Sequence, residues 1–117
     1  MKKVLVVDDE EHILMLVELS LRPEFSVIKA RDGNEALRLA EKEKPSLVLL
    51  DLMMPGINGF DVCKKLKMKK LPVWILSAKG LKDDVSKGLG CGADQYITKP
   101  FDPDELAKKV ADFFGGD

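Results

Sequence analysis

Short apolar runs alternate with longer amphipathic patterns along the whole chain. The runs are rich in Val, Ile and Leu, and they lie at residues 3–7, 25–30, 46–50, 71–76 and 93–97. An apolar run without polar alternation is typical of a parallel strand that is covered on both faces of its sheet. The run at 25–30 holds more polar residues than the others, so we expect its strand to lie nearer an edge.

Amphipathic segments with helical periodicity follow each of these runs. They cover residues 10–21, 32–44, 59–68 and 102–114, with a weaker pattern at 82–89 that has few large apolar side chains. Pro23 and Pro45 mark the ends of the first two helices, and Pro103 suits the first position of the last one. This regular alternation predicts an α/β sandwich, with right-handed crossovers and helices on both faces of a parallel sheet.

Length and composition agree with one domain over residues 1–117. Hydrophobic residues make up 45% of the chain and charged residues 33%, as in ordinary globular proteins. No apolar stretch is long enough for a transmembrane helix or a secretory leader. Cys63 and Cys91 form no CxxC pair, which argues against a disulfide framework or a zinc finger and suggests a cytoplasmic protein. The net charge of −1 argues against direct nucleic acid binding.

Conspicuous polar residues follow four of the five predicted strands. They are Asp8 and Asp9, Asp51, Ser77, and Lys99. Ligands of doubly wound sheets bind outside the carboxyl ends of the strands, near the topological switch point. Three carboxylates at one edge would repel one another, so a divalent cation and the Lys99 ammonium are expected to neutralise them. Oxygen ligands without cysteine or paired histidine favour Mg²⁺.

The motifs around these residues resemble the receiver domain of two-component response regulators. They are Val7-Asp8-Asp9, Leu50-Asp51 with Pro55-Gly56, Leu76-Ser77-Ala78, and Tyr96 with Lys99-Pro100-Phe101, in the family's order and spacing. The resemblance covers the whole chain. It implies a flavodoxin-like (βα)5 fold with strand order 2-1-3-4-5. It also implies that the protein is a signalling switch and not an enzyme that releases a product. Its implied phosphoryl donor is the phosphohistidine of a sensor histidine kinase or phosphotransfer protein.

The resemblance assigns the phosphoryl acceptor and the metal ligands. Asp51 is implied as the acceptor, which would form an acyl phosphate. Asp9 and Asp51 are implied as direct Mg²⁺ ligands, Asp8 as a ligand through water, and Met53 as a ligand through its backbone carbonyl.

The resemblance also implies a conformational switch. The Ser77 hydroxyl and Lys99 are implied to contact the phosphoryl oxygens, and Tyr96 to rotate inward when Ser77 moves. The Lys99–Pro100 peptide bond is expected to be cis. Residues 82–92 are expected to be loosely held and to form, with the fifth strand and last helix, the surface that changes on phosphorylation. That surface would meet a downstream effector or a severed output domain.

Three other functions are less consistent with these residues. A phosphatase of the haloacid-dehalogenase type needs a second Asp two residues after its nucleophile, where this chain has Met53. A flavodoxin-like flavin carrier needs a Ser/Thr/Gly-rich first loop, whereas the acidic residues 8–11 would repel a flavin phosphate. A pseudo-receiver that signals without phosphate would not need the complete residue set.

Several further side chains carry weaker predictions. The lysines of residues 64–70 indicate a solvated helix face rather than a patch for an anionic partner. His12 is expected at the surface, Cys63 and Cys91 as small core or loop residues, and Met15 and Met68 as packing residues. Because the chain ends soon after its last predicted helix, we expect either a stand-alone regulator or a receiver excised from a longer protein.

Overall fold

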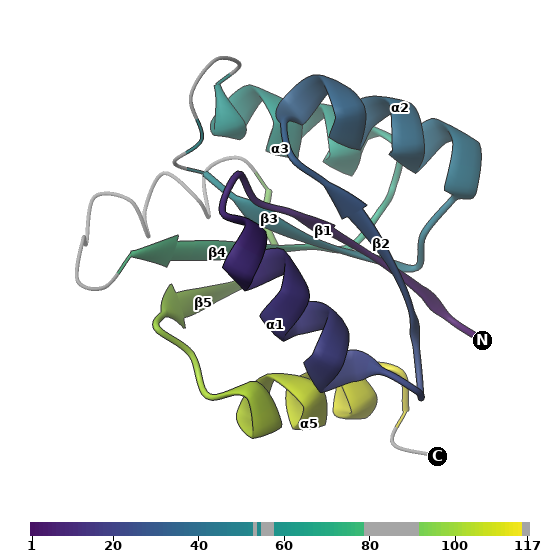
Figure 1. Ribbon diagram of the computed structural model, residues 1–117. Helices are drawn as coiled ribbons and strands as arrows, with labels where there is room; N and C mark the ends of the chain where they lie inside the picture. Colours follow the sequence, from purple (N-terminus) through teal and green to yellow (C-terminus); the bar gives the residue numbers. More distant parts are fainter. Residues whose placement is uncertain (53, 55–57, 79–91, 116–117) are drawn as a thin grey trace.

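Five parallel strands form one sheet in the order β2-β1-β3-β4-β5, as predicted (Figure 1). The computed structural model describes residues 1–52, 54, 58–78 and 92–115. The strands are β1 (Lys3–Val7), β2 (Ser26–Ala30), β3 (Leu47–Asp51), β4 (Val73–Ala78) and β5 (Gln95–Lys99). The helices are α1 (Glu11–Leu21), α2 (Gly33–Glu43), α3 (Gly59–Met68) and α5 (Pro103–Phe113). The helix predicted at 82–89 lies outside the described residues.

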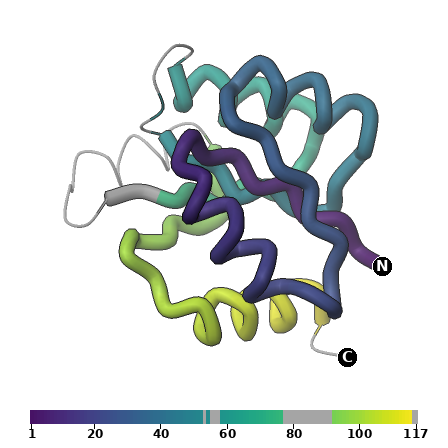
Figure 2. Tube along the Cα trace, viewed as in Figure 1, coloured from purple at the N-terminus to yellow at the C-terminus, as the bar shows by residue number. Residues whose placement is uncertain are grey.

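The helices form two layers around the sheet. Helices α1 and α5 cover one face and α2 and α3 cover the other, which the Cα trace also shows (Figure 2). Each face buries its own apolar cluster against the sheet. The central strands β1 and β3 are almost wholly buried, whereas β2 is only half-buried at the edge, as its more polar sequence predicts. Within the described residues, no helix has the length and hydropathy of a membrane span.

Helix boundaries follow local capping signals. Asp32 begins α2 by accepting the backbone N–H of Glu35, and Asp102 begins α5 by accepting that of Asp104. Both carboxylates satisfy donors that an isolated helix leaves unpaired. These two starts agree with the sequence-based expectation.

Strands β4 and β5 lie two residues farther along the chain than their apolar runs predict. The register pairs Ser77 with Thr98, and Ala78 with Lys99, so both strands continue past their large apolar residues. At the other end, Asp94 accepts the Val73 N–H through its carboxylate at 2.9 Å. Hydrophobicity alone therefore misplaced the boundaries, because backbone pairing extends past the buried part of each strand.

Some packing predictions are confirmed and two are wrong. Of the core and loop positions open to the cysteines, Cys63 takes the core, whereas Cys91 lies outside the described residues. The Lys99–Pro100 bond is cis, as expected. Met15 and Met68, expected to pack, are both exposed. The helices bury other positions instead, Leu14 and Val17 in α1 and Leu66 in α3, so these methionines lie on the outer sides.

Candidate functional site

Three charged side chains meet at the carboxyl ends of β1, β3 and β5. The Lys99 Nζ lies 2.6 Å from Asp8 Oδ2 and 3.4 Å from Asp51 Oδ2. The side chain of Asp8 is 0% exposed and that of Lys99 is 15% exposed. A charge pair this deeply buried is stable only when its partners satisfy one another, so the three residues form one interdependent cluster.

The local backbone holds Asp8 in place. Its N–H donates to the carbonyl of Ala30 on the neighbouring edge strand, at 3.1 Å. Its Oδ1 accepts the backbone N–H of Glu10 at 2.9 Å, so the carboxylate closes the turn that leads from β1 into α1. The other oxygen, Oδ2, remains directed to Lys99. Asp8 therefore links the sheet, the first turn and the site ammonium.

The acidic surroundings keep Lys99 charged. Burial lowers the pKa of Lys99, but the hydrogen bond to Asp8 and the charges of Asp51 and Asp8 outweigh it, so the net shift is upward. A protonated ammonium beside two carboxylates supplies a fixed positive charge at the sheet edge. Such a charge can stabilise added negative charge without reorganisation of solvent.

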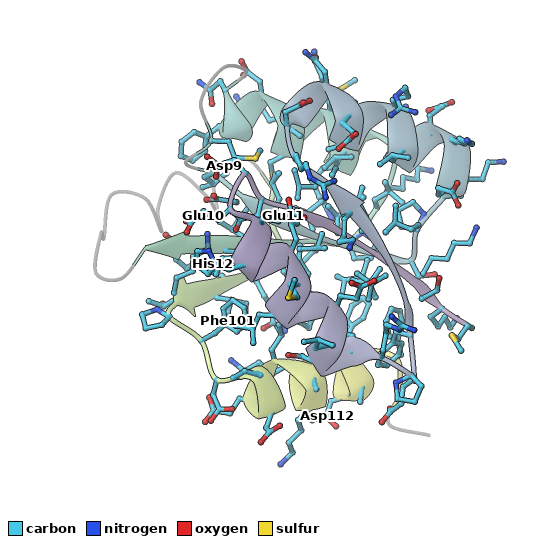
Figure 3. The ribbon with its side chains drawn as sticks, viewed as in Figure 1. Asp9, Glu10, Glu11, His12, Phe101 and Asp112 are labelled. Atoms are coloured by element: carbon cyan, nitrogen blue, oxygen red, sulfur yellow. The ribbon has the colours of Figure 1, made fainter. Side chains whose placement is uncertain are left out.

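An acidic group extends the site toward solvent. One carboxylate oxygen from each of Asp8, Asp9 and Glu10 lies within 4.8 Å of the others. Figure 3 shows Asp9 and Glu10 at the start of α1, with Glu11 and His12 in its first turn. A buried carboxylate beside exposed ones provides hard oxygen ligands and leaves room for water, which suits Mg²⁺. The residues present therefore fit this ion.

Glu10 is a site residue that the sequence-based reasoning missed. Its Oε1 lies 4.0 Å from Lys99 Nζ, and its Oε2 lies 3.3 Å from His12 Nε2. The available signal was its place in the acidic run 8–11, directly after Asp8 and Asp9. His12 itself is exposed, as expected.

The other predicted site residues are described to different extents. Met53 lies outside the described residues. Ser77 lies in β4 beside Thr98 of β5, but its side chain is not described. Tyr96 is half-buried and packs against the apolar cluster on the α2–α3 face. Its hydroxyl is buried and has no hydrogen-bond partner among residues 1–52, 54, 58–78 and 92–115.

Gly59 sets the position of the segment that follows Asp51. A Cβ at Gly59 would lie 2.6 Å from the carbonyl oxygen and 2.7 Å from the Cα of Leu52. We expect Gly59→Ala to lower the free energy of unfolding by about 1–3 kcal/mol, because backbone must shift to relieve the overlap. Denaturant unfolding measures this effect. Asp61→Ala, an exposed change in the same helix turn, should cost less than about 1 kcal/mol. Equal losses in the two variants would contradict the expected overlap.

The chain belongs to the response regulator receiver domain family, whose profile matches residues 4–111. The alkaline phosphatase synthesis transcriptional regulatory protein PhoP of Bacillus subtilis (strain 168) is 50% identical over 112 residues, 93% of this chain and 47% of PhoP. The BeF3-activated receiver domain of DrrB, a Thermotoga maritima response regulator, has a TM-score of 0.90 at 34% identity, and 97% of each chain is covered. Vibrio cholerae CheY4 has a TM-score of 0.88 at 32% identity over 96% of this chain and 98% of its own.

The family assignment confirms the class of protein predicted from the motifs. Receiver domains are signalling modules of two-component systems, are typically non-enzymatic, and bind Mg²⁺. The chain spans about half the length of PhoP, one of the curated relatives it matches.

Proposed function

We propose that this receiver domain, extending over residues 1–117, accepts a phosphoryl group on Asp51 from the phosphohistidine of a sensor histidine kinase or phosphotransfer protein. The observation that carries the proposal is Lys99 Nζ placed between Asp8 and Asp51 at the carboxyl edge of the sheet. Phosphoryl transfer depends mainly on positioning and on neutralising charge, and this cluster supplies both.

Asp51 acts as the nucleophile in this proposal. One of its carboxylate oxygens forms a bond to phosphorus, and the bond from phosphorus to the donor nitrogen breaks. Lys99 contacts the phosphoryl oxygens and compensates for their charge, and Ser77 donates its hydroxyl to another of them. The domain thereby assists its own phosphorylation and, later, the hydrolysis of its acyl phosphate.

The proposed Mg²⁺ ligands are Asp9, Asp51 and the backbone carbonyl of Met53, with Asp8 acting through water. The acidic group of Asp8, Asp9 and Glu10 supports an ion at this edge. When bound, Mg²⁺ supplies Lewis-acid charge for the transferring phosphoryl group. The chain itself orients the carboxylates, since the turn after β1 fixes Asp8 through the Glu10 N–H.

The proposed output is a change of surface at β5, α5 and the segment 82–92, which precedes β5. A phosphoryl group brings a charge of about −1.5 to −2, which would draw the Ser77 hydroxyl inward. Tyr96 would follow by rotating its side chain. Its buried hydroxyl, without a partner in the described part of the chain, supports this role because such a group has little to hold it in one position. The partner would be a downstream effector or an attached output domain.

Acetyl phosphate provides a kinase-free test of this proposal. Incubation with acetyl phosphate and Mg²⁺ is expected to add the mass of one phosphoryl group, and hydroxylamine should remove it, as it removes acyl phosphates. The same incubation with EDTA should leave the mass unchanged. Intact-protein mass spectrometry follows each reaction. A hydroxylamine-resistant phosphate, or a mass gain that does not require Mg²⁺, would contradict the proposed acceptor and metal.

A further inference from the structure

A groove lies between the C-terminal ends of α2 and α3. It has a volume of about 360 Å³ and is lined by Ala40, Glu41, Lys44, Pro45, Lys69 and Leu71. Ala40 and Pro45 are buried and Leu71 is half-buried, so apolar side chains form part of its lining. The groove therefore combines an apolar surface with charged side chains.

Lysines dominate the charge around this groove. Lys69 forms an ion pair with Glu41 across it. The pKa of Glu41 is lowered, first by the hydrogen bond from Lys69 and also by the charge of Lys69 and Lys44. Within the described residues, Lys44 and Lys70 form no ion pair, and both have positive φ values of 50° and 63°. The groove consequently keeps uncompensated positive charge after the Glu41 pair is formed.

The positive φ values make these two lysines unusual. Backbone in this region disfavours a side chain by about 1–2 kcal/mol, and glycine is the common residue where a helix ends this way. The chain nevertheless has a long basic side chain at both positions, Lys44 in the groove lining and Lys70 between the lining residues Lys69 and Leu71. Capping requirements alone therefore do not account for Lys44 and Lys70.

An exposed apolar residue directly precedes the groove lining along the chain. Met68 at the end of α3 is 82% exposed, which is far more than its residue type usually shows in a folded domain. It directly precedes Lys69, a residue that lines the groove. A partner that covered Met68 would gain apolar burial, and the nearby lysines would select its charge.

We propose that the groove between the ends of α2 and α3 binds an acidic protein segment with apolar side chains. Carboxylates of the segment would pair with Lys44 and Lys70, and its apolar side chains would cover Met68 and the groove surface. Nucleic acid is less well matched, because its phosphates would use the lysines but leave Met68 uncovered. This assigns a partner to Lys70, which belongs to the lysine run of residues 64–70 that the sequence analysis interpreted as a solvated helix face.

The groove lies near the amino-terminal ends of the strands, on the side of the sheet opposite the proposed phosphorylation site. The strands end on the side of the sheet that carries Asp8 and Asp51. The helices run antiparallel to the strands, so α2 and α3 end on the opposite side (Figure 1). Binding at the groove is therefore independent of the acceptor carboxylate. The partner would be held whether or not the domain is phosphorylated.

A synthetic peptide tests the groove directly. The probe is a fluorescein-labelled peptide of Glu and Asp residues with two leucines four positions apart, measured by anisotropy and by amide chemical shifts of the ¹⁵N-labelled protein. We expect saturable binding with the largest shifts at Ala40, Lys44 and Leu71. Lys44→Gln with Lys70→Gln should weaken binding about five- to tenfold, and Met68→Gln about tenfold.

Matched controls separate the groove from general charge. Lys108→Gln with Lys109→Gln removes the same charge from α5 and should leave the affinity unchanged. Asp51→Asn should also bind normally, so a failure of the proposed phosphorylation would not affect this result. The proposal is overturned if both double lysine variants lose the same affinity for the peptide. It is also overturned if millimolar peptide causes no amide chemical-shift change. Equal binding of a peptide with serine for leucine, or of an oligothymidylate at the same amides, would also overturn it.

Discussion

Asp51→Asn is expected to abolish phosphoryl incorporation from acetyl phosphate. Asparagine keeps the shape of the side chain, so the substitution removes the nucleophilic carboxylate and changes little else. Asp51 is nearly buried and lies 3.4 Å from Lys99. A neutral amide there also removes one of the negative charges around the proposed Mg²⁺ site, so the affinity for Mg²⁺ should fall.

Intact mass and Mg²⁺ titration measure these two effects in the same variant. The fully buried Trp74 lies in β4, whose neighbour β3 ends at Asp51, and it offers a fluorescence signal for the titration. Asp61→Asn, an exposed change in α3, is the matched control and should keep the complete mass gain. A phosphoryl group on the Asp51→Asn variant would show that another residue is the acceptor.

Lys99→Met is expected to affect both stability and phosphorylation. The substitution leaves the buried Asp8 carboxylate without its cation. It also removes the positive charge that contacts both Asp8 and Asp51. Removing one partner of a buried charge pair costs about 3–5 kcal/mol; the lower value applies here because Lys99 retains some exposure. The melting temperature in EDTA should therefore fall by roughly 10 °C. Phosphoryl incorporation should slow by about 10²–10³-fold, the usual effect of losing one group that stabilises transition-state charge.

Mg²⁺ and pH distinguish this electrostatic cause from simple loss of packing. Added Mg²⁺ should raise the melting temperature of Lys99→Met more than that of the unmodified protein, because the ion replaces the missing positive charge. The raised pKa of Lys99 means that its stabilising effect is complete below the ordinary lysine value of 10.5 and is lost as pH rises through the raised value. The two proteins should therefore converge in stability only at strongly alkaline pH.

An exposed lysine provides the control for Lys99→Met. Lys108→Met on α5 should change the free energy of unfolding by no more than about 0.5 kcal/mol and leave phosphorylation intact. If Lys99→Met and Lys108→Met had the same free energy of unfolding in EDTA, the Lys99 ammonium could not be the main counter-charge of Asp8.

Local sequence was sufficient for most elements but not for every boundary. The wholly apolar run at 3–7 predicted β1 correctly, and the more polar run at 25–30 predicted an edge strand, because each pattern reports how many faces of a strand are covered. The same rule misplaced β5 by two residues. Thr98 and Lys99 are polar, yet they pair with β4 at the sheet edge where the site requires polar groups.

The candidate site was predictable in its residue types but not in its contacts. Parallel strands bring their carboxyl ends to one edge, so the pattern of Asp8, Asp51 and Lys99 after strands was enough to expect a common site. The contact of Glu10 with Lys99 depends on the turn into α1, which no residue spacing specifies. The close approach of Gly59 to Leu52 depends in the same way on how the chain returns from β3 into α3.

Hydrophobic periodicity by itself determined the α/β fold class, because each pattern reports local burial. The strand-end motifs identified the receiver family by resemblance, and the strand order followed only from that resemblance. Only the tertiary structure decided which charges neutralise one another. Asp8 and Lys99 are 91 positions apart, and their 2.6 Å contact exists only because β1 and β5 end at the same edge. It also decided that Met68, which precedes the groove-lining Lys69, is exposed, since which helix face is covered depends on the neighbouring helix.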